Sequence, residues 1–462
     1  MALPSAPAAS PIPQITGMRP VPDAALPTER SGLYVPIWVK FVVSQSFALA
    51  WVTFSIWLSL PWLRDLAGVV TWPAALAMIT FIAYVPGYLV ALLCSSLLLD
   101  RLPPLKVTHP TEPVTVLIAA RNERTTIGPT LTYLASQDYD GPLSIVVIDN
   151  GSTDGTAQIA RRSARELGLD VRVITETTPG KSHALNTGLR EVETELLATV
   201  DADTLLHPSA LRLITARMRS APNEVVAVAG HVLVRNNRDG MIARMQDWDY
   251  SLGVSAIKRI QGMYQGTLVA QGAFSLYDRS VVEAVGGWPE GVGEDIILTW
   301  RFLEHGGSVH HEPLAIGFTT VPVTLRALAR QRARWARGMI EALRDVHPFR
   351  QRRFYPKFLT SVNLVIPCLD LAFTVVWLPG LLLAFTGRFW IVGAYTLLVV
   401  PLSFGASLLM RRSNRRIFNA LGLRVRRNRF GFVTYVLGFQ LIQSPVSLWG
   451  YTREFLNLKK TW

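Results

Sequence analysis

Two long apolar stretches near the start of the chain limit what it can fold into more than any other feature. They run from about Leu33 to Leu60 and from about Trp72 to Leu99. Each is long enough to cross a bilayer core about 30 Å thick as a helix, and Pro61 is predicted to end the first. Basic residues flank the pair on its outer sides, so the enrichment of Lys and Arg in cytoplasmic loops predicts a transmembrane hairpin with both ends in the cytoplasm.

The composition agrees with a membrane protein that also has a globular part. The chain has 462 residues, of which 50% are hydrophobic, more than in an ordinary soluble domain. Its formal net charge is +13, which in such a protein reflects the bias of cytoplasmic loops, so we expect no nucleic-acid partner. Two cysteines, both inside hydrophobic runs, exclude a disulfide framework and a cysteine-based zinc site.

The two ends of the chain differ in character. Residues 1–32 are rich in Pro, Ala and Ser, which predicts a disordered tail. Beyond Phe354 the apolar character returns, and further spans are predicted at about 358–385, 389–410 and 432–449. Eight arginines between the last two spans place that loop in the cytoplasm: they are Arg411, Arg412, Arg415, Arg416, Arg424, Arg426, Arg427 and Arg429.

Polar residues inside these C-terminal spans leave two questions open. The last span contains Gln440, Gln443 and Pro445, so it either crosses the membrane or lies at its surface. Asp370 sits deep in an apolar run, where an ionisable residue is a functional candidate. It either lines a path for a sugar or pairs with another helix.

Between the two apolar regions, from Val114 to about Thr320, short β runs alternate with helical patterns, as in a doubly wound α/β domain. Strands are predicted at 114–120, 143–148, 171–174 and 196–200. Polar groups follow three of them, because Glu123, Asp149 and the pair Asp201 and Asp203 come just after strand ends. Ligands of open α/β sheets bind at the carboxyl ends of strands, so these groups predict a site there.

Asp201 and Asp203 are separated by one residue, and side chains two apart share a face in extended backbone. Two carboxylates with room for water and phosphate suit Mg²⁺ or Mn²⁺ bridging a diphosphate. Taken alone, the pattern favours a strand followed by an Asp-rich turn over a metal site.

Several motifs in a fixed order resemble those of inverting family-2 glycosyltransferases with the A-type fold. The resemblance covers roughly residues 110–345. The motifs are Ile118 to Glu123, Asp149 to Thr156, Gly180 to Asn186, Asp201-Ala202-Asp203, Gln271 to Tyr277, Gly287-Trp288, Gly293-Glu294-Asp295 and Gln331-Arg332-Ala333-Arg334-Trp335. The last resembles a signature of membrane-embedded processive synthases of hyaluronan, chitin, cellulose and poly-N-acetylglucosamine. Gly293 departs from the Thr often found before Glu-Asp.

The resemblance implies roles on the side of a UDP-sugar donor. It implies that Asp203 binds a divalent metal, Mg²⁺ or Mn²⁺. It implies that the nucleotide-sugar is bound by Glu123, Asp149, Lys181, Asp201, Gln331, Arg334 and Trp335.

The resemblance also implies a polysaccharide acceptor, bound by Gly272, Glu294 and Trp335. Asp295 is the implied general base, since a carboxylate near the acceptor hydroxyl can take its proton as the new bond forms. From the sequence alone, Asp295 equally suits an acid at a helix start. The segment from Leu325 to Leu343 interleaves arginines with apolar residues, as in an amphipathic helix at a membrane surface.

These inferences give an α/β chain in which a Rossmann-like A-type glycosyltransferase domain in the cytoplasm is inserted between transmembrane helices, with amphipathic interface helices. The expected parts are a tail (1–32), a transmembrane hairpin (33–105), the glycosyltransferase domain (106–320), an interface segment (321–355) and a C-terminal transmembrane region (356–462). The expected location is the plasma membrane.

The expected function is processive transfer of a sugar, N-acetylglucosamine in first place, to a β-linked polysaccharide that passes through the bilayer, where accessory export subunits could join it. Hyaluronan-, chitin- and glucan-type synthesis remain alternatives, as does single transfer to a lipid carrier. A transporter or receptor with a degenerate nucleotide-binding domain is the alternative from another class.

Overall fold

A mixed sheet forms the centre of the α/β domain in the computed structural model, which describes residues 18–28, 35–101, 103–423 and 428–458. Within these residues it has eight strands in the order β3-β2-β1-β4-β7-β6-β8-β5. They are β1 (Val114–Ala120), β2 (Leu143–Asp149), β3 (Val171–Thr175), β4 (Leu196–Val200), β5 (Leu205–Leu206), β6 (Val225–Val234), β7 (Phe274–Asp278) and β8 (Ser308–Thr319). The four predicted strands are confirmed as β1 to β4.

The sheet has a parallel half and a mixed half. Strands β3, β2, β1 and β4 are parallel neighbours, whereas β7 runs antiparallel to both β4 and β6. The helices of the domain are α4 (Ile127–Ala135), α5 (Thr156–Leu167), α6 (Lys181–Leu189), α7 (Ala210–Ser220), α10 (Arg279–Ala284) and α11 (Glu294–Glu304). Side chains such as Val116, Ile118, Leu131 and Phe274 are buried in the core between sheet and helices, as expected of central strands covered by helices.

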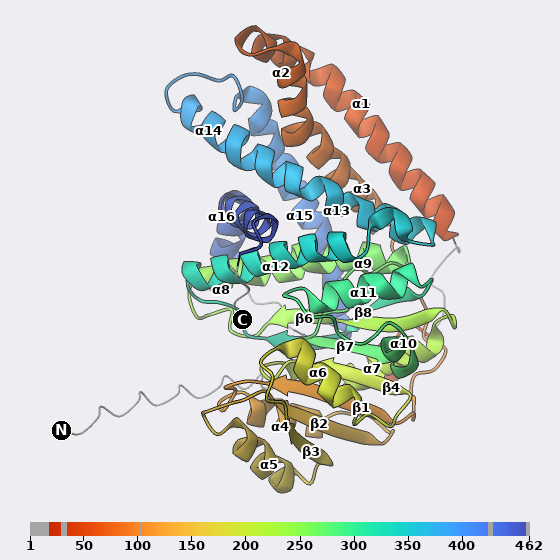
Figure 1. The fold of residues 1–462 in the computed structure, drawn as a ribbon. Helices are drawn as coiled ribbons and strands as arrows, with labels where there is room; N and C mark the ends of the chain where they lie inside the picture. Colours follow the sequence, from red (N-terminus) through yellow and green to blue (C-terminus); the bar gives the residue numbers. More distant parts are fainter. Residues whose placement is uncertain (1–17, 29–34, 102, 424–427, 459–462) are drawn as a thin grey trace, which may run out of the picture.

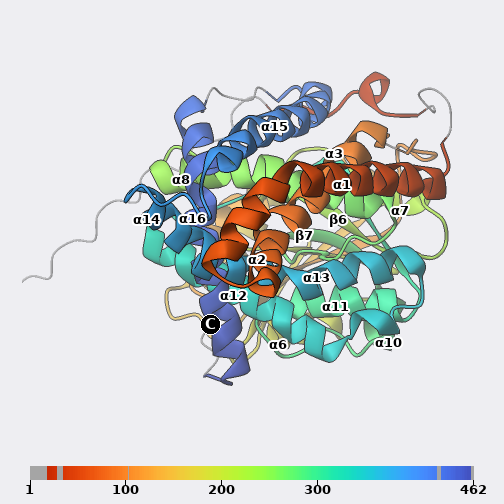
Figure 2. The same cartoon turned by 90° about the horizontal axis from the view of Figure 1, so that it is seen from above.

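Long apolar helices lie above this domain (Figure 1). They are α1 (Ile37–Val69), the continuous run of α2 (Trp72–Ile79), η2 (Thr80–Tyr84) and α3 (Val85–Leu99), and the run of α13 (Phe354–Ala372), η5 (Phe373–Trp377) and α14 (Leu378–Ala384). Among the described residues, these three helices are long and apolar enough to cross a membrane. Seen from above, they lie over the α/β domain rather than beside it (Figure 2).

Three predictions about the apolar helices need correction. The first helix does not end at Pro61 but continues to Val69, because an apolar helix tolerates the loss of one backbone donor. The predicted span at 389–410 corresponds to α15 (Ala394–Ala420), whose crossing of a membrane stays a prediction. The last predicted span is α16 (Arg429–Phe455), which is not among the described helices that are apolar enough to cross a membrane. Arg411 to Arg416, predicted in a loop, continue α15, whereas residues 424–427 lie outside the described chain.

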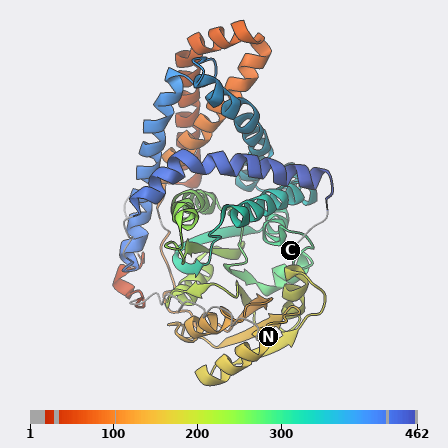
Figure 3. The same ribbon diagram turned by 90° about the vertical axis from the view of Figure 1, so that its left-hand side faces the viewer.

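A layer of interface helices separates the sheet from the apolar helices. It contains α8 (Met241–Trp248), the π-helical segment η3 (Asp249–Val254), α9 (Ser255–Met263), α12 (Leu325–Asp345) and α16. Helix α16 runs beneath the apolar helices and alongside α12 (Figure 3). The last predicted span thus lies in the layer between the sheet and the apolar helices, and its place relative to a membrane stays a prediction. The predicted amphipathic helix from Leu325 is confirmed as α12.

Asp370 in α13 bonds to this layer. Its carboxylate accepts hydrogen bonds from Ser444 Oγ at 2.6 Å and from Tyr451 Oη at 2.8 Å, both on α16. Of the two alternatives for Asp370, the structure therefore shows pairing with another helix.

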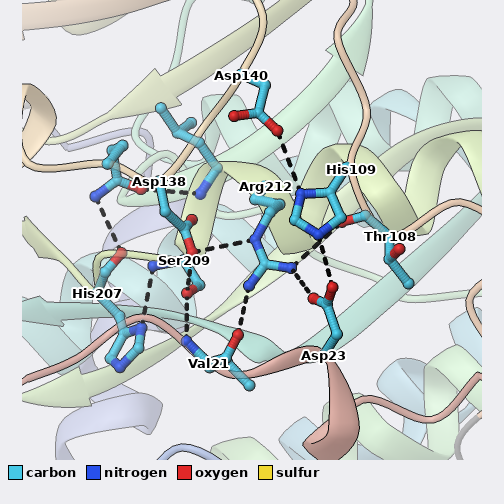
Figure 4. Close-up of polar contacts among 11 residues, drawn as sticks. Val21, Asp23, Thr108, His109, Asp138, Asp140, His207, Ser209 and Arg212 are labelled. Carbon is cyan, nitrogen blue, oxygen red and sulfur yellow. Dashed lines mark hydrogen bonds and ion pairs between the residues drawn. The ribbon is translucent and has the colours of Figure 1, made fainter.

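Residues 18–28 correct part of the prediction of a disordered tail. The side chains of Val21 and Leu26 are buried against the α/β core. Arg212 of α7 donates to the Val21 carbonyl at 2.7 Å and to Asp23 at 3.2 Å (Figure 4). These bonds order the segment despite its composition. Residues 1–17 and 29–32 of the predicted tail lie outside the described residues.

Candidate active site

The predicted polar residues gather where β2, β1 and β4 end. The carboxyl of Asp149 is buried at the end of β2 and accepts a hydrogen bond from Ser152 N at 3.3 Å. The register pairs Asp149 with Ala120, the last residue of β1. Three residues further on, Glu123 accepts a 2.5 Å bond from Thr126 Oγ1. Burial raises the pKa of Glu123, and the charge of Asp201 adds to that shift.

Lys181 joins this edge to the second half of the domain. Its helix, α6, begins after Gly180, whose φ of +147° few other residues adopt. The Lys181 ammonium lies 2.6 Å from Asp201 Oδ1 and 3.7 Å from Glu294 Oε1. Burial opposes its charge, but these two carboxylates outweigh burial and raise the pKa of Lys181.

Gly272 lies directly against this ion pair. A Cβ at Gly272 would be 2.5 Å from Lys181 Nζ and 3.8 Å from Asp201 Oδ1. Any side chain there would therefore push the lysine away, which explains why the loop has glycine at this position.

Asp203 has hydroxyl partners, and within the described chain no cationic side chain forms an ion pair with its carboxylate. Its Oδ1 accepts from Thr319 Oγ1 at 3.2 Å, while Arg235 reaches its backbone carbonyl. Burial, with the charges of Asp201 and Glu123, raises the pKa of Asp203 to about 6. A half-buried carboxylate that has no ion-pair partner of its own fits a site for a divalent cation.

The protein alone does not supply a full set of metal ligands. Within the described residues, no group of three or more His, Cys, Asp or Glu side chains is placed to hold a metal ion. Mg²⁺ is commonly bound by one or two carboxylates together with waters and substrate phosphates. Asp203, with Asp201 beside it, fits that kind of site.

Asp295 lies in the first turn of α11. Its Oδ1 accepts from Ile296 N at 2.8 Å, and its backbone carbonyl accepts from Thr299 Oγ1 at 2.6 Å. Thr299 Oγ1 in turn accepts from Ala270 N at 2.9 Å, so the loop before β7 is bound to this helix. The preceding Glu294 is buried, and burial raises the pKa of its carboxyl.

The motif on α12 presents polar and aromatic groups to the same region. Arg334 is exposed, as is Trp335 at 40%. The Oε1 of Gln331 is buried without a hydrogen-bond partner among the described residues, so it is available to a ligand. Tyr250 of η3 faces the motif, because its ring centroid lies 6.3 Å from that of Trp335.

The structure therefore brings together Lys181, Asp201, Gly272 and Glu294 by direct contact. Asp203 lies two residues from this group, and Asp149 and Glu123 lie at the neighbouring strand ends. Gln331, Arg334 and Trp335 are on a separate helix, where the Trp335 ring lies 6.3 Å from that of Tyr250.

Sequence reasoning missed four residues around the site: Tyr250, Lys258, Thr319 and Arg332. Arg332, inside the motif, is paired with Asp249 at 2.6 Å and lies 4.3 Å over the Trp335 ring. Lys258 is half-buried and donates to the Val269 carbonyl at 3.0 Å; loss of solvent around its ammonium lowers its pKa to about 7. The arginine-rich motif was a signal for Arg332, whereas nothing in the local sequence marks the other three.

Comparison with known proteins agrees with this geometry. Residues 110–338 match the model of the family described as glycosyltransferase like family 2. Poly-β-1,6-N-acetyl-D-glucosamine synthase of Staphylococcus aureus (strain COL) is 30% identical over 273 residues, which cover 59% of this chain and 65% of the relative. The same-named protein of Staphylococcus epidermidis is 30% identical over 239 residues, 51% of this chain and 57% of the relative. The matches thus span less than two thirds of these curated relatives.

A solved structure shares the fold. The mannosyltransferase of Pyrobaculum calidifontis, in complex with GDP-Man and Mn²⁺, superposes with a TM-score of 0.54 at 19% identity. The superposition covers 92% of this chain and all of the other. This confirms the predicted A-type glycosyltransferase fold.

Proposed function

We propose that this chain, whose residues 110–338 match glycosyltransferase family 2, is an enzyme. It transfers N-acetylglucosamine from its UDP derivative to a growing β-linked polysaccharide. The choice of sugar rests on the relatives that are named for poly-β-1,6-N-acetyl-D-glucosamine. The reaction is processive, and the polymer crosses the membrane as it grows.

One observation carries the proposal, namely the position of Lys181 between Asp201 and Glu294. Asp201 belongs to the strand-end carboxylates that suit a nucleotide diphosphate, and Glu294 precedes the candidate base. A single half-buried cation in contact with both supports one site in which donor and acceptor meet.

The donor half of the site needs a divalent cation, Mg²⁺ or Mn²⁺, held by Asp203 with Asp201 beside it. Such a cation neutralises the charge that develops on the diphosphate leaving group. Lys181 and Arg334 add positive charge there, and a guanidinium can bind two phosphate oxygens at once. The mannosyltransferase of the same fold, crystallised with a nucleotide sugar and Mn²⁺, supports this assignment.

The acceptor half centres on Asp295. Its carboxylate takes the proton of the acceptor hydroxyl while that oxygen bonds to the anomeric carbon and UDP leaves, in a single displacement that inverts the carbon. Trp335, with its exposed ring, offers a platform on which the apolar face of a sugar stacks.

The position of the site supports coupling to a membrane. The three helices apolar enough to span a bilayer lie above the domain, with α12 between them and the sheet (Figure 1). In this proposal the domain lies on the cytoplasmic side of the plasma membrane, where UDP-sugars are made, and each addition moves the polymer outward.

The test is to supply the purified, lipid-embedded protein with a panel of radiolabelled UDP-sugars and either Mg²⁺ or Mn²⁺. A high-molecular-weight product from UDP-N-acetylglucosamine that a β-1,6-specific hexosaminidase degrades supports the proposal. Label in a product of one sugar on lipid would instead indicate single transfer to a lipid carrier. Preference for another donor would indicate hyaluronan-, chitin- or glucan-type synthesis.

A further inference from the structure

The segment that leads into the candidate base is held by a carboxylate from another helix. Glu341 of α12 is buried, with 7% of its surface exposed. Its Oε2 accepts hydrogen bonds from two consecutive backbone amides, Val292 N at 2.9 Å and Gly293 N at 3.1 Å. Asp295 follows Gly293 by two residues.

The N-cap residue of helix α11 makes no side-chain bond to the helix start. This residue is Gly293, which has no side chain to accept a hydrogen bond. Amides at a helix start lack partners within the helix, and an unsatisfied buried donor is destabilising. Glu341 of α12 accepts from the amide of this N-cap residue and from the amide before it, so the geometry of the base segment depends on where α12 lies.

A contact between two glycines sets that position. A Cβ on Gly293 would lie 2.6 Å from Gly338 Cα, and a Cβ on Gly338 would lie 2.8 Å from Gly293 Cα. Both distances are too short for carbon atoms that are not bonded. The two backbones therefore touch, one helical turn from Glu341 on α12. This explains why the chain has Gly293 where related motifs often have Thr.

Helix α12 is in turn fixed on its other side. Arg337 Nε pairs with Glu454 Oε2 of α16 at 2.6 Å, with both side chains buried. The two helices also share an apolar contact, in which Ile340 packs with Tyr451 of α16. The helix that presents Gln331, Arg334 and Trp335 is thus fixed between α16 and the start of α11.

We infer that Glu341 is a positioning residue for Asp295. It holds the amides of Val292 and Gly293 at the distance set by the Gly293–Gly338 contact, and thereby fixes the candidate base relative to the Gln331 to Trp335 motif. The inference rests on the proposed function, since it assigns Asp295 the role of base.

The test compares Glu341→Met, which removes the acceptor, with Glu341→Gln, which keeps one acceptor oxygen. We expect Glu341→Met to lower kcat about 10- to 100-fold, because small misplacements of a reacting group have effects of that size. The KM for the UDP-sugar stays within about twofold of wild type, since the donor contacts of Lys181 and Asp203 are intact. Glu341→Gln restores most of kcat.

Asp345→Asn is the matched control. Asp345 also lies on α12 and also pairs with α11, through Arg301 at 2.8 Å, but at the exposed far end. The kcat of Asp345→Asn is expected to stay near that of wild type. Equal kcat in Glu341→Met and wild type, or equal losses in Glu341→Met and Asp345→Asn, would overturn the inference.

Two further measurements keep the test decisive. Should Glu341→Met fail to fold, Gly338→Ala must lower kcat while leaving UDP binding in the presence of Mn²⁺ unchanged; an unchanged kcat overturns the inference. Hydrogen exchange at Val292 and Gly293 must also become faster in a folded Glu341 variant. A wild-type protein that transfers no sugar contradicts the proposed function, whereas an active wild type with an unaffected Glu341→Met contradicts only the positioning role.

Discussion

The ammonium nitrogen of Lys181 lies 2.6 Å from Asp201 Oδ1. Asp201 is therefore neutralised by the protein itself, whereas Asp203, two residues further on, has hydroxyl partners and a pKa raised to about 6. The two carboxylates differ because the lysine reaches only the first. The charge that the protein leaves uncompensated is thus at Asp203, where we assign the divalent cation.

Replacing Asp203 should affect stability and activity in opposite directions. Its raised pKa means that the ionised form is disfavoured in the folded protein, so stability present below pH 4 is lost as the pH rises through about 6. We expect metal-free Asp203→Asn to melt a few degrees above wild type at pH 7.5 and to lack sugar transfer. Calorimetry at pH 4 and 7.5 tests this, with Glu166→Gln on the exposed side of α5 as control. A melting temperature that is no higher than wild type at pH 7.5 would refute it.

The pH profile of transfer should depend on metal concentration. Only the ionised Asp203 carboxylate binds a cation, so activity at low Mn²⁺ should fall as the pH drops through about 6. Because metal and proton compete for the same oxygen atoms, higher Mn²⁺ should move the midpoint to lower pH. Initial rates at two Mn²⁺ concentrations between pH 5 and 8 measure this. An identical midpoint at both would argue against Asp203 as a ligand.

Removing the candidate base should leave donor binding intact. Asp295→Asn keeps the shape of the side chain but loses the proton acceptor, and general-base catalysis contributes about 10²- to 10⁴-fold. We expect kcat to fall by that factor while the affinity for UDP with Mn²⁺ is unchanged. Transfer assays and calorimetric titration measure the two quantities. A kcat near that of wild type would show that another residue acts as the base.

The bond between α13 and α16 should contribute to stability. Asp370→Ala leaves the hydroxyls of Ser444 and Tyr451 without their acceptor, and such losses typically destabilise by about 1–3 kcal/mol. We expect a lower melting temperature and faster proteolysis at α16. Asn363→Ala on the same helix is the control, since its amide bonds to carbonyls within α13. Equal effects of the two variants would show that Asp370 does not hold α16.

The parallel half of the fold was accessible from sequence because its strands are short apolar runs followed by polar residues, as with Leu196–Val200 before Asp201. The second half was harder. Strands β6 to β8 differ in direction, and α16 was ambiguous because its glutamines lower its hydropathy while its length suits a span. The prediction that Pro61 ends the first helix was wrong, because α1 continues beyond it to Val69.

The residues of the site also fall into a group that the sequence predicts and a group that it does not. Asp201, Asp203 and Asp295 belong to motifs that local sequence contains. Glu341 and Thr319 bond to residues 48 to 116 positions away, namely Val292, Gly293 and Asp203. Tyr250 likewise contacts Trp335 of a distant helix. Local sequence does not show such contacts, so these residues became visible only when the chain was folded.

The most direct test of the central claim is the incorporation of label from UDP-N-acetylglucosamine into polymer by the lipid-embedded protein, with and without a chelator. The structure leads us to expect polymer synthesis that requires Mg²⁺ or Mn²⁺ and releases one UDP for each sugar added. Transfer that continues undiminished in excess chelator, or no transfer with either metal, would contradict a site built on Asp203 and Asp295.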